Sequence, residues 1–190
     1  MKSPHHCLSV AFFTLVGSFQ GLQASTVTND ADSGAGSLRA AIAGATSGET
    51  ITFDPSLSGS TITLTSDHLL INNLTVTIDA SSLPTGLTLS GNNLKRVLAI
   101  IGTSDVTLRN LSIRNGRAVD NNGGGVFLGA GNLNMVNCSV RDCFATYNGG
   151  GIYLNFAVTA TIDRCLVTGN TSNSGYGGGI GVAGASTTLF

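Results

Sequence analysis

The feature that most constrains the fold of this sequence is a short motif, three glycines followed by an aliphatic residue, that occurs three times. Its copies begin 26 and 28 residues apart, at Gly123, Gly149 and Gly177. A nearly fixed period of this length is typical of chains built from repeated units that stack on one another. The motif residues are Gly123, Gly124, Gly125 and Val126; Gly149, Gly150, Gly151 and Ile152; and Gly177, Gly178, Gly179 and Ile180.

The segments upstream of the three motifs align with one another without gaps, from Val106, from Leu133 and from Ala160. Apolar residues occupy alternate positions within each segment, as Val106 and Leu108 do on either side of Thr107. A period of two indicates short β-strands and not helices. Each aligned column is apolar, and we expect it to face the core. The core columns are Leu111, Cys138 and Cys165; Ile113, Val140 and Val167; and Val126, Ile152 and Ile180.

Each unit also needs corners where the chain changes direction. The alternation is interrupted by one position at Asn110, Asn137 and Arg164, where we expect the first corner. Asn suits such a corner because it tolerates left-handed backbone and can form local hydrogen bonds. The glycine triplets provide the other corner, where a side chain would clash.

Matched columns that run in the same chain direction predict strands that are parallel, in register and about 4.8 Å apart. A meander of hairpins, the alternative, does not account for that shared direction. The sequence therefore predicts an all-β fold, a right-handed parallel β-helix, with roughly four to five coils over residues 74–190.

Residues 25–73 are predicted to contain an N-terminal cap and the first strands. The run from Gly34 to Ala45 has one apolar helical face, and Ser37 precedes it as a candidate N-cap. A short helix here would cover the open first coil. The residues of that face are Leu38, Ala41, Ile42 and Ala45.

Residues 1–24 have the layout of a secretory signal peptide: a weakly basic start, an apolar run from Leu8 to Phe19, and a small residue at Ala24. The apolar run is shorter than the roughly 20 residues of a membrane-spanning helix. The chain ends at Phe190, where another strand would begin, so we expect a longer parent protein. A net charge of −1 argues against a nucleic-acid partner or an anionic membrane surface.

The opening TVTNDADSGAGSLRAAIAGATSGETITFDP, followed by TITL, LTVTIDA, LTLSG and the glycine motifs, resembles bacterial exported β-helix repeat proteins. These include proteins of the choice-of-anchor type, and the repeats also resemble those of polymorphic outer-membrane proteins. The FxxN motif of the latter family is not found in this sequence. The resemblance implies a secreted or surface-attached protein that is usually non-catalytic and much longer.

Candidate ligand-binding residues come from the columns that face outward. Arg114 and Arg141 are expected one coil apart on the same face, where two guanidinium groups could hold an acidic sugar or a carboxylate. The alternative is a pair of solvated arginines that contributes little. One outward column contains Arg109, Val136 and Asp163, and no two carboxylates stack in the aligned columns, so we predict no catalytic residues.

We also predict no metal site and no cofactor, because His68 is the only histidine after the predicted leader. The cysteines that remain after the predicted leader, Cys138, Cys143 and Cys165, are odd in number, so they cannot all pair with one another. A Cys138–Cys165 disulfide is compatible with adjacent coils. We favour reduced thiols stacked in the core.

Three functions follow from these features. The preferred hypothesis is a secreted or cell-surface, adhesin-like scaffold that is monomeric and contacts glycans or surface proteins. The second is the N-terminal part of a polysaccharide lyase or glycoside hydrolase whose active site lies beyond residue 190. The third is an autotransporter-like passenger.

Overall fold

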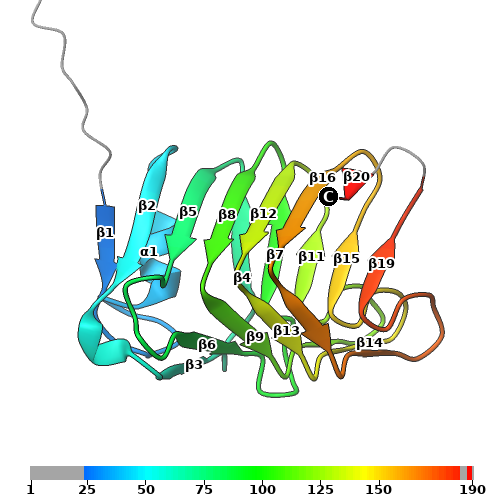
Figure 1. The fold of residues 1–190 in the computed structure, drawn as a ribbon, viewed down its shortest axis with the longest axis horizontal. Coiled ribbons are helices and arrows are strands. Elements are labelled where there is room, and N and C mark those ends of the chain that lie inside the picture. Colours follow the sequence, from blue (N-terminus) through cyan, green and yellow to red (C-terminus); the bar gives the residue numbers. More distant parts are fainter. Residues whose placement is uncertain (1–23, 185–187, 190) are drawn as a thin grey trace, which may run out of the picture.

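The computed structural model describes residues 24–184 and 188–189, which form an all-parallel β-solenoid of about six turns (Figure 1). The predicted fold class, a parallel β-helix with one short helix, is confirmed; the right-handed sense of the coil stays a prediction. The expected number of coils was too low. The missed turn lies in residues 49–72, where three strands of three to five residues are too short and too irregularly spaced to show a period.

The strands form four parallel sheets that run along the solenoid. Sheet A contains β1 (Ala24–Val27), β2 (Glu49–Phe53), β5 (Thr75–Asp79), β8 (Asp105–Arg109), β12 (Asn132–Val136), β16 (Thr159–Asp163) and β20 (Thr188–Leu189). Sheet B contains β3 (Thr61–Thr63), β6 (Leu87–Ser90), β9 (Leu111–Arg114), β13 (Ser139–Arg141) and β17 (Leu166–Thr168). Sheet C contains β4 (Leu69–Asn72), β7 (Leu98–Ile101), β11 (Val126–Leu128), β15 (Ile152–Leu154) and β19 (Ile180–Val182). Sheet D contains the two-residue strands β10 (Arg117–Ala118), β14 (Phe144–Ala145) and β18 (Thr171–Ser172).

The core consists of apolar columns stacked coil on coil. Val140 pairs in register with Ile113 on one side and with Val167 on the other, and Ile152 pairs with Val126 and Ile180 in the same way. Cys138 precedes the paired strand β13, as Leu111 begins β9, so the third column is also continuous. The last member of each column is less buried than the others, because no further strand covers it within the described residues. These last members are Cys165, Val167 and Ile180.

Both kinds of corner have left-handed backbone. Asn110, Asn137 and Arg164 have φ values of 55°, 54° and 50°. The first glycine of each triplet also has a positive φ, 64° at Gly123, while the second glycine is constrained by space. A Cβ on Gly124 would lie 2.2 Å from the Phe144 carbonyl oxygen, so no side chain fits there. The glycines therefore allow adjacent coils to turn in close contact.

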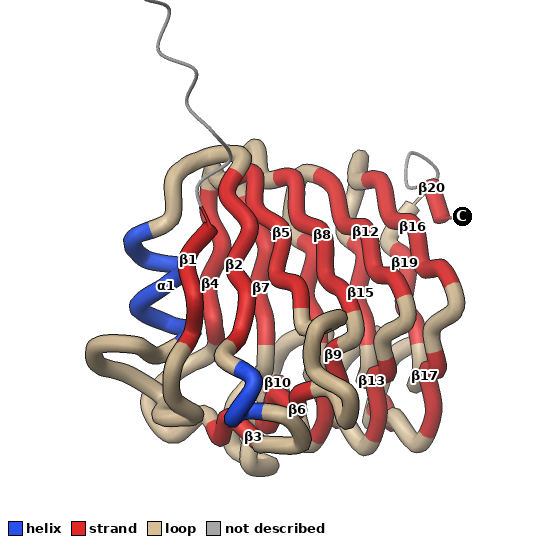
Figure 2. The backbone as a smooth tube through the Cα atoms, turned by 60° about the vertical axis from the view of Figure 1, so that its left-hand side comes forward, coloured by secondary structure: helices blue, strands red, loops and turns tan. Residues whose placement is uncertain are grey.

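The helix α1 (Leu38–Gly44) lies at the N-terminal end of the stack, beside β1 and β4 (Figure 2). Ser37 is its N-cap, and the Ser37 side chain accepts a hydrogen bond from the Ala40 amide. Leu38 and Ile42 are buried against the core. The predicted helix thus has the predicted cap and covers the first coil. A 3₁₀ turn, η1 (Pro55–Leu57), follows β2 and buries Leu57.

Candidate functional site

The two arginines singled out by the sequence lie on neighbouring strands of sheet B. Arg114 ends β9, Arg141 ends β13, and the two are paired in register. The preceding residues, Ile113 and Val140, are fully buried in the core. Because side chains alternate along a strand, both arginines belong to the outer face. They lie one strand spacing apart, about 4.8 Å.

A column of hydroxyl groups runs beside the arginines. Ser112 and Ser139 are also paired in register, and the Ser139 Oγ donates a hydrogen bond to the Ser112 Oγ at 3.1 Å. Two consecutive coils therefore present the same outward Ser-x-Arg tripeptide. We call the four residues Ser112, Arg114, Ser139 and Arg141 the Ser–Arg block.

Neither guanidinium group of the Ser–Arg block forms an ion pair within the described part of the chain. The Nε atom of Arg114 is buried and has no hydrogen-bond acceptor, which is uncommon for a buried donor. The flanking residues in the arginine column, Ser90 and Thr168, are uncharged. Asp142 follows Arg141 but sits at a corner with φ 56° and makes no ion pair with it. The block is therefore an uncompensated pair of positive charges.

Sheet A has a different distribution of charge. Arg109 pairs in register with Asp79, and on its other side the column continues through Val136 to Asp163. The sequence alignment had placed Arg109, Val136 and Asp163 together, and it missed Asp79 as the fourth member. Charges of opposite sign thus share this column, in contrast to the Ser–Arg block.

Two further arginines lie over aromatic rings, a contact that no sequence pattern predicts. The guanidinium carbon of Arg96 is 4.7 Å from the centre of the Phe127 ring, and that of Arg117 is 4.6 Å from the Phe144 ring. Arg96 also donates to the Gly123 carbonyl at 2.9 Å, and its burial lowers its pKa. These cation–π contacts hold the glycine corner and sheet D in place, so we assign them a structural role.

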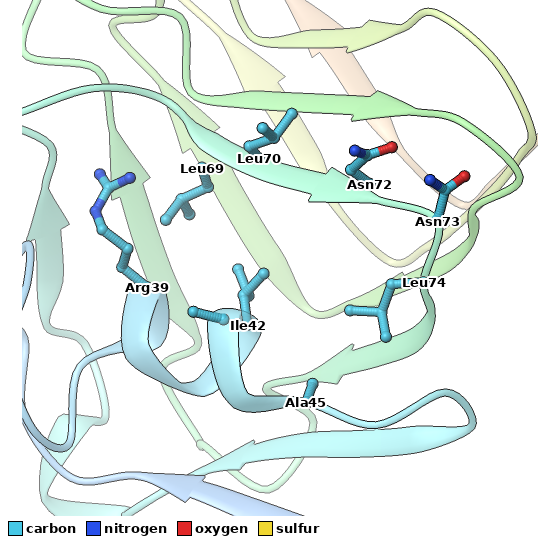
Figure 3. A pocket seen from close by; sticks show the side chains of 9 residues that line it. Arg39, Ile42, Ala45, Leu69, Leu70, Asn72, Asn73 and Leu74 are labelled. Atoms are coloured by element: carbon cyan, nitrogen blue, oxygen red, sulfur yellow. The ribbon is translucent and has the colours of Figure 1, made fainter.

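A cavity of about 410 Å³ lies between α1 and the edge strand β4 (Figure 3). Its apolar walls come from Ile42, Leu69 and Leu74, and Figure 3 shows Asn72 and Asn73 at one end. Sequence reasoning missed this cavity, because α1 and β4 are separated in the sequence by β2, η1 and β3. Its one charged lining residue, Arg39, is bonded elsewhere, as described next.

Arg39 holds the loop after β1 to the loop before β4. It donates to the Asp32 carboxylate at 2.6 Å and to the His68 carbonyl at 2.8 Å. The same carboxylate accepts from the Ser66 amide at 2.8 Å and from the Thr65 amide at 3.2 Å. Burial by itself raises the pKa of Asp32, but the hydrogen bonds from Arg39, Ser66 and Thr65 outweigh it and hold that pKa well below its usual range.

The remaining titratable candidates are also engaged in local structure. His68 Nδ1 lies 2.8 Å from a carboxylate oxygen of Asp67, next to it in the sequence. Glu49 is buried, and it accepts hydrogen bonds from the Ser25 hydroxyl and from the Thr46 amide, which lower its pKa. No group of three or more His, Cys, Asp or Glu residues within residues 24–184 could hold a metal ion.

The three cysteines among the described residues, Cys138, Cys143 and Cys165, are free thiols in the stack. Cys138 and Cys143 are buried, and burial raises the pKa of each thiol to about 11. The Cys165 Sγ accepts a hydrogen bond from the Cys138 amide at 3.3 Å, which places the two residues in the same column. A thiol with such a high pKa is a weak nucleophile at neutral pH, which fits the packing role expected from the sequence.

Most of the predicted leader, residues 1–23, lies outside the described residues, and Ala24 begins β1. No helix in the described part of the chain is long and apolar enough to cross a membrane. Comparison with protein-family models, with curated proteins and with solved structures finds no match to this chain. The resemblance to exported β-helix repeat proteins is therefore supported at the level of the solenoid fold alone.

Proposed function

We propose that this chain is part of an exported, non-catalytic β-solenoid scaffold, secreted or held at the cell surface, that binds anionic glycans through the Ser–Arg block. The observation that carries this proposal is the pair of in-register guanidinium groups, Arg114 and Arg141, with no carboxylate partner in the described residues. Two arginines placed side by side can donate paired, charge-assisted hydrogen bonds to a carboxylate or sulfate.

The electrostatics favour an anion over other ligands. Like charges opposite each other on neighbouring strands destabilise a sheet slightly, and an anion that binds between Arg114 and Arg141 would remove that repulsion. The Ser112 and Ser139 hydroxyls beside them offer hydrogen bonds to the hydroxyl groups of a sugar. The block therefore combines charge recognition with hydroxyl recognition.

Export is supported by the N-terminal sequence alone, through its basic start, apolar run and small residue at Ala24. A rigid solenoid suits display outside the cell, because stacked coils hold outward residues at fixed spacing. Anionic glycans are among the ligands that such a surface would meet.

The test is a direct binding measurement by calorimetry, with polygalacturonate as the acidic polymer and dextran as the neutral one. We expect the chain to bind polygalacturonate and not dextran, and the binding to weaken as salt is raised. The double variant R114Q/R141Q should bind about tenfold or more weakly, because one charge-assisted hydrogen bond contributes about 1.5–3 kcal/mol.

Arg109→Gln is the matched control, because it removes one arginine from the end of a strand in sheet A and leaves the Ser–Arg block intact. It should leave the affinity unchanged. If R109Q and R114Q/R141Q lose affinity for polygalacturonate equally, binding depends on the overall charge of the chain, which contradicts the proposal. Release of cleaved oligosaccharide during the same incubation would refute the non-catalytic part.

A further inference from the structure

The geometry of sheet B points to a more specific ligand: we propose that the block binds a linear acidic polysaccharide whose chain runs along the solenoid axis, with one sugar per coil. This inference rests on the proposed function, because it takes the Ser–Arg block as the binding site and names the class and orientation of the polymer.

The arginine and serine side chains of sheet B repeat from strand to strand and not along one strand. Along β9 or β13 there is one outward arginine, whereas across the strands Arg114 is followed by Arg141 at the spacing of one coil. Ser112 is followed by Ser139 in the same direction. A ligand that repeats the same charged group at each step matches this surface only if it crosses the strands. A uronate chain carries one carboxylate per ring, so its repeated charges can be met by arginines on successive coils, which lie about 4.8 Å apart.

The arginine column continues through uncharged residues on both sides of the block, whereas the hydroxyl column continues on one side only and meets the exposed Leu166 on the other. The hydroxyl column extends from Ser112 to Thr88 and then to Thr61. The arginine column continues to Ser90 on one side and to Thr168 on the other. No acidic residue occurs in either column, so an anionic polymer can extend past the block without repulsion from the sheet itself.

Other anionic ligands match this face less well. A small monovalent anion would use the two guanidinium groups and would leave the hydroxyl column without a role. Single-stranded nucleic acid is bound mainly by stacking of bases on aromatic side chains, and the outward columns of sheet B contain Ser, Thr, Arg and Leu but no aromatic residue. A polymer of acidic sugars therefore fits this face best.

The first experiment measures the affinity for galacturonate oligomers from the monomer to the octamer, with an oligonucleotide of matched charge as a second probe. We expect the affinity to rise steeply from monomer to about tetramer and then to level off, as the polymer covers the coils that carry the two columns. R114Q and R141Q should each weaken binding of the tetramer and should remove most of its advantage over the monomer.

The second experiment adds a charge in the predicted direction. Thr168 is exposed and pairs in register with Arg141, so Thr168→Arg extends the arginine column by one coil. This variant should bind the hexamer about threefold or more tightly and leave monomer binding unchanged. Thr161→Arg places the same charge on sheet A of the same coil and serves as the control, with no gain expected.

The outcomes separate this inference from the proposed function. If monomer and hexamer bind equally well and both depend on Arg114 and Arg141, the block is an anion site and the axial polymer is refuted. Equal gains from T168R and T161R would also refute it. Tighter binding of the oligonucleotide, with the same arginine dependence, would replace the polysaccharide with a phosphodiester polymer. No binding of any acidic probe would reject both proposals.

Discussion

Arg39 in the N-terminal cap and the arginines of the Ser–Arg block show two opposite uses of the same side chain. Arg39 donates through three nitrogens to Asp32 and to the backbone of the loop before β4. Arg114 and Arg141 form no ion pair in the described residues, although the chain has a net charge of −1.

The difference shows which arginine is available to a ligand. A guanidinium group whose donors are used by the fold is held in place, and its removal leaves partly buried acceptors without partners. A guanidinium group that the fold does not use contributes little to stability. The cap arginine should therefore control stability without affecting binding, and the Ser–Arg block should control binding without affecting stability.

Ile152→Asp should have the largest effect, because it disrupts the stack on which both regions depend. Ile152 is fully buried between Val126 and Ile180. An unpaired carboxylate there costs several kcal/mol, about 3–5 or more. Urea unfolding followed by circular dichroism should show a much lower midpoint or no folded state. Ile152→Val, which keeps the column apolar, should lose only about 1 kcal/mol. If I152D has the same urea midpoint as the parent, the column of Val126, Ile152 and Ile180 is not part of the core.

Asp32→Ala should have the next largest effect, on the order of 1–2 kcal/mol in the free energy of unfolding. The substitution removes the acceptor for Arg39 and for the amides of Thr65 and Ser66. Asp30→Ala is a suitable control, because Asp30 is exposed in the same loop. Polygalacturonate binding by D32A, measured where the variant is folded, should equal that of the parent.

The difference in stability between the parent and D32A should also depend on pH, in a direction set by the pKa of Asp32. The pKa of Asp32 is lower in the folded state than in the unfolded chain, where it is near 3.9. The ionised Asp32 carboxylate therefore contributes fully to the free energy of unfolding above pH 4 to 5. This contribution is lost as the pH falls towards the pKa of Asp32 in the folded state. The stability difference between parent and D32A should be constant at neutral pH and should shrink below pH 4. A difference that grows on acidification would contradict the Arg39–Asp32 network.

R114Q/R141Q should have the smallest effect on stability. Its free energy of unfolding should lie within about 0.5 kcal/mol of the parent's, and slightly above it where the loss of like-charge repulsion stabilises the sheet. Thermal unfolding in the absence of ligand measures this change. In the presence of polygalacturonate the parent should gain stability through binding and the variant should not. A large loss of stability in the variant without ligand would mean that the arginines serve the fold.

The repeated coils could be predicted in detail from the sequence. The columns that contain Cys138, Val140 and Ile152, and the register of Arg114 with Arg141, follow from a period of 26 to 28 residues and strict alternation. The helix after Ser37 was also predictable, because capping and a helical apolar face are local signals. The first described coil was not, because β3 has three residues and its spacing to β4 matches no later unit.

The sequence by itself determined the solenoid, because each coil repeats a local pattern of alternating side chains and tight corners. It also determined which residues face outward, including the pair Arg114 and Arg141. Only the tertiary structure decided which charges are compensated: Arg39 meets Asp32 and the loop at His68, whereas Arg114 keeps an unpaired buried Nε. The physical reason is that hydrogen-bond partners depend on loops that meet across coils, and no repeat in the sequence specifies those contacts.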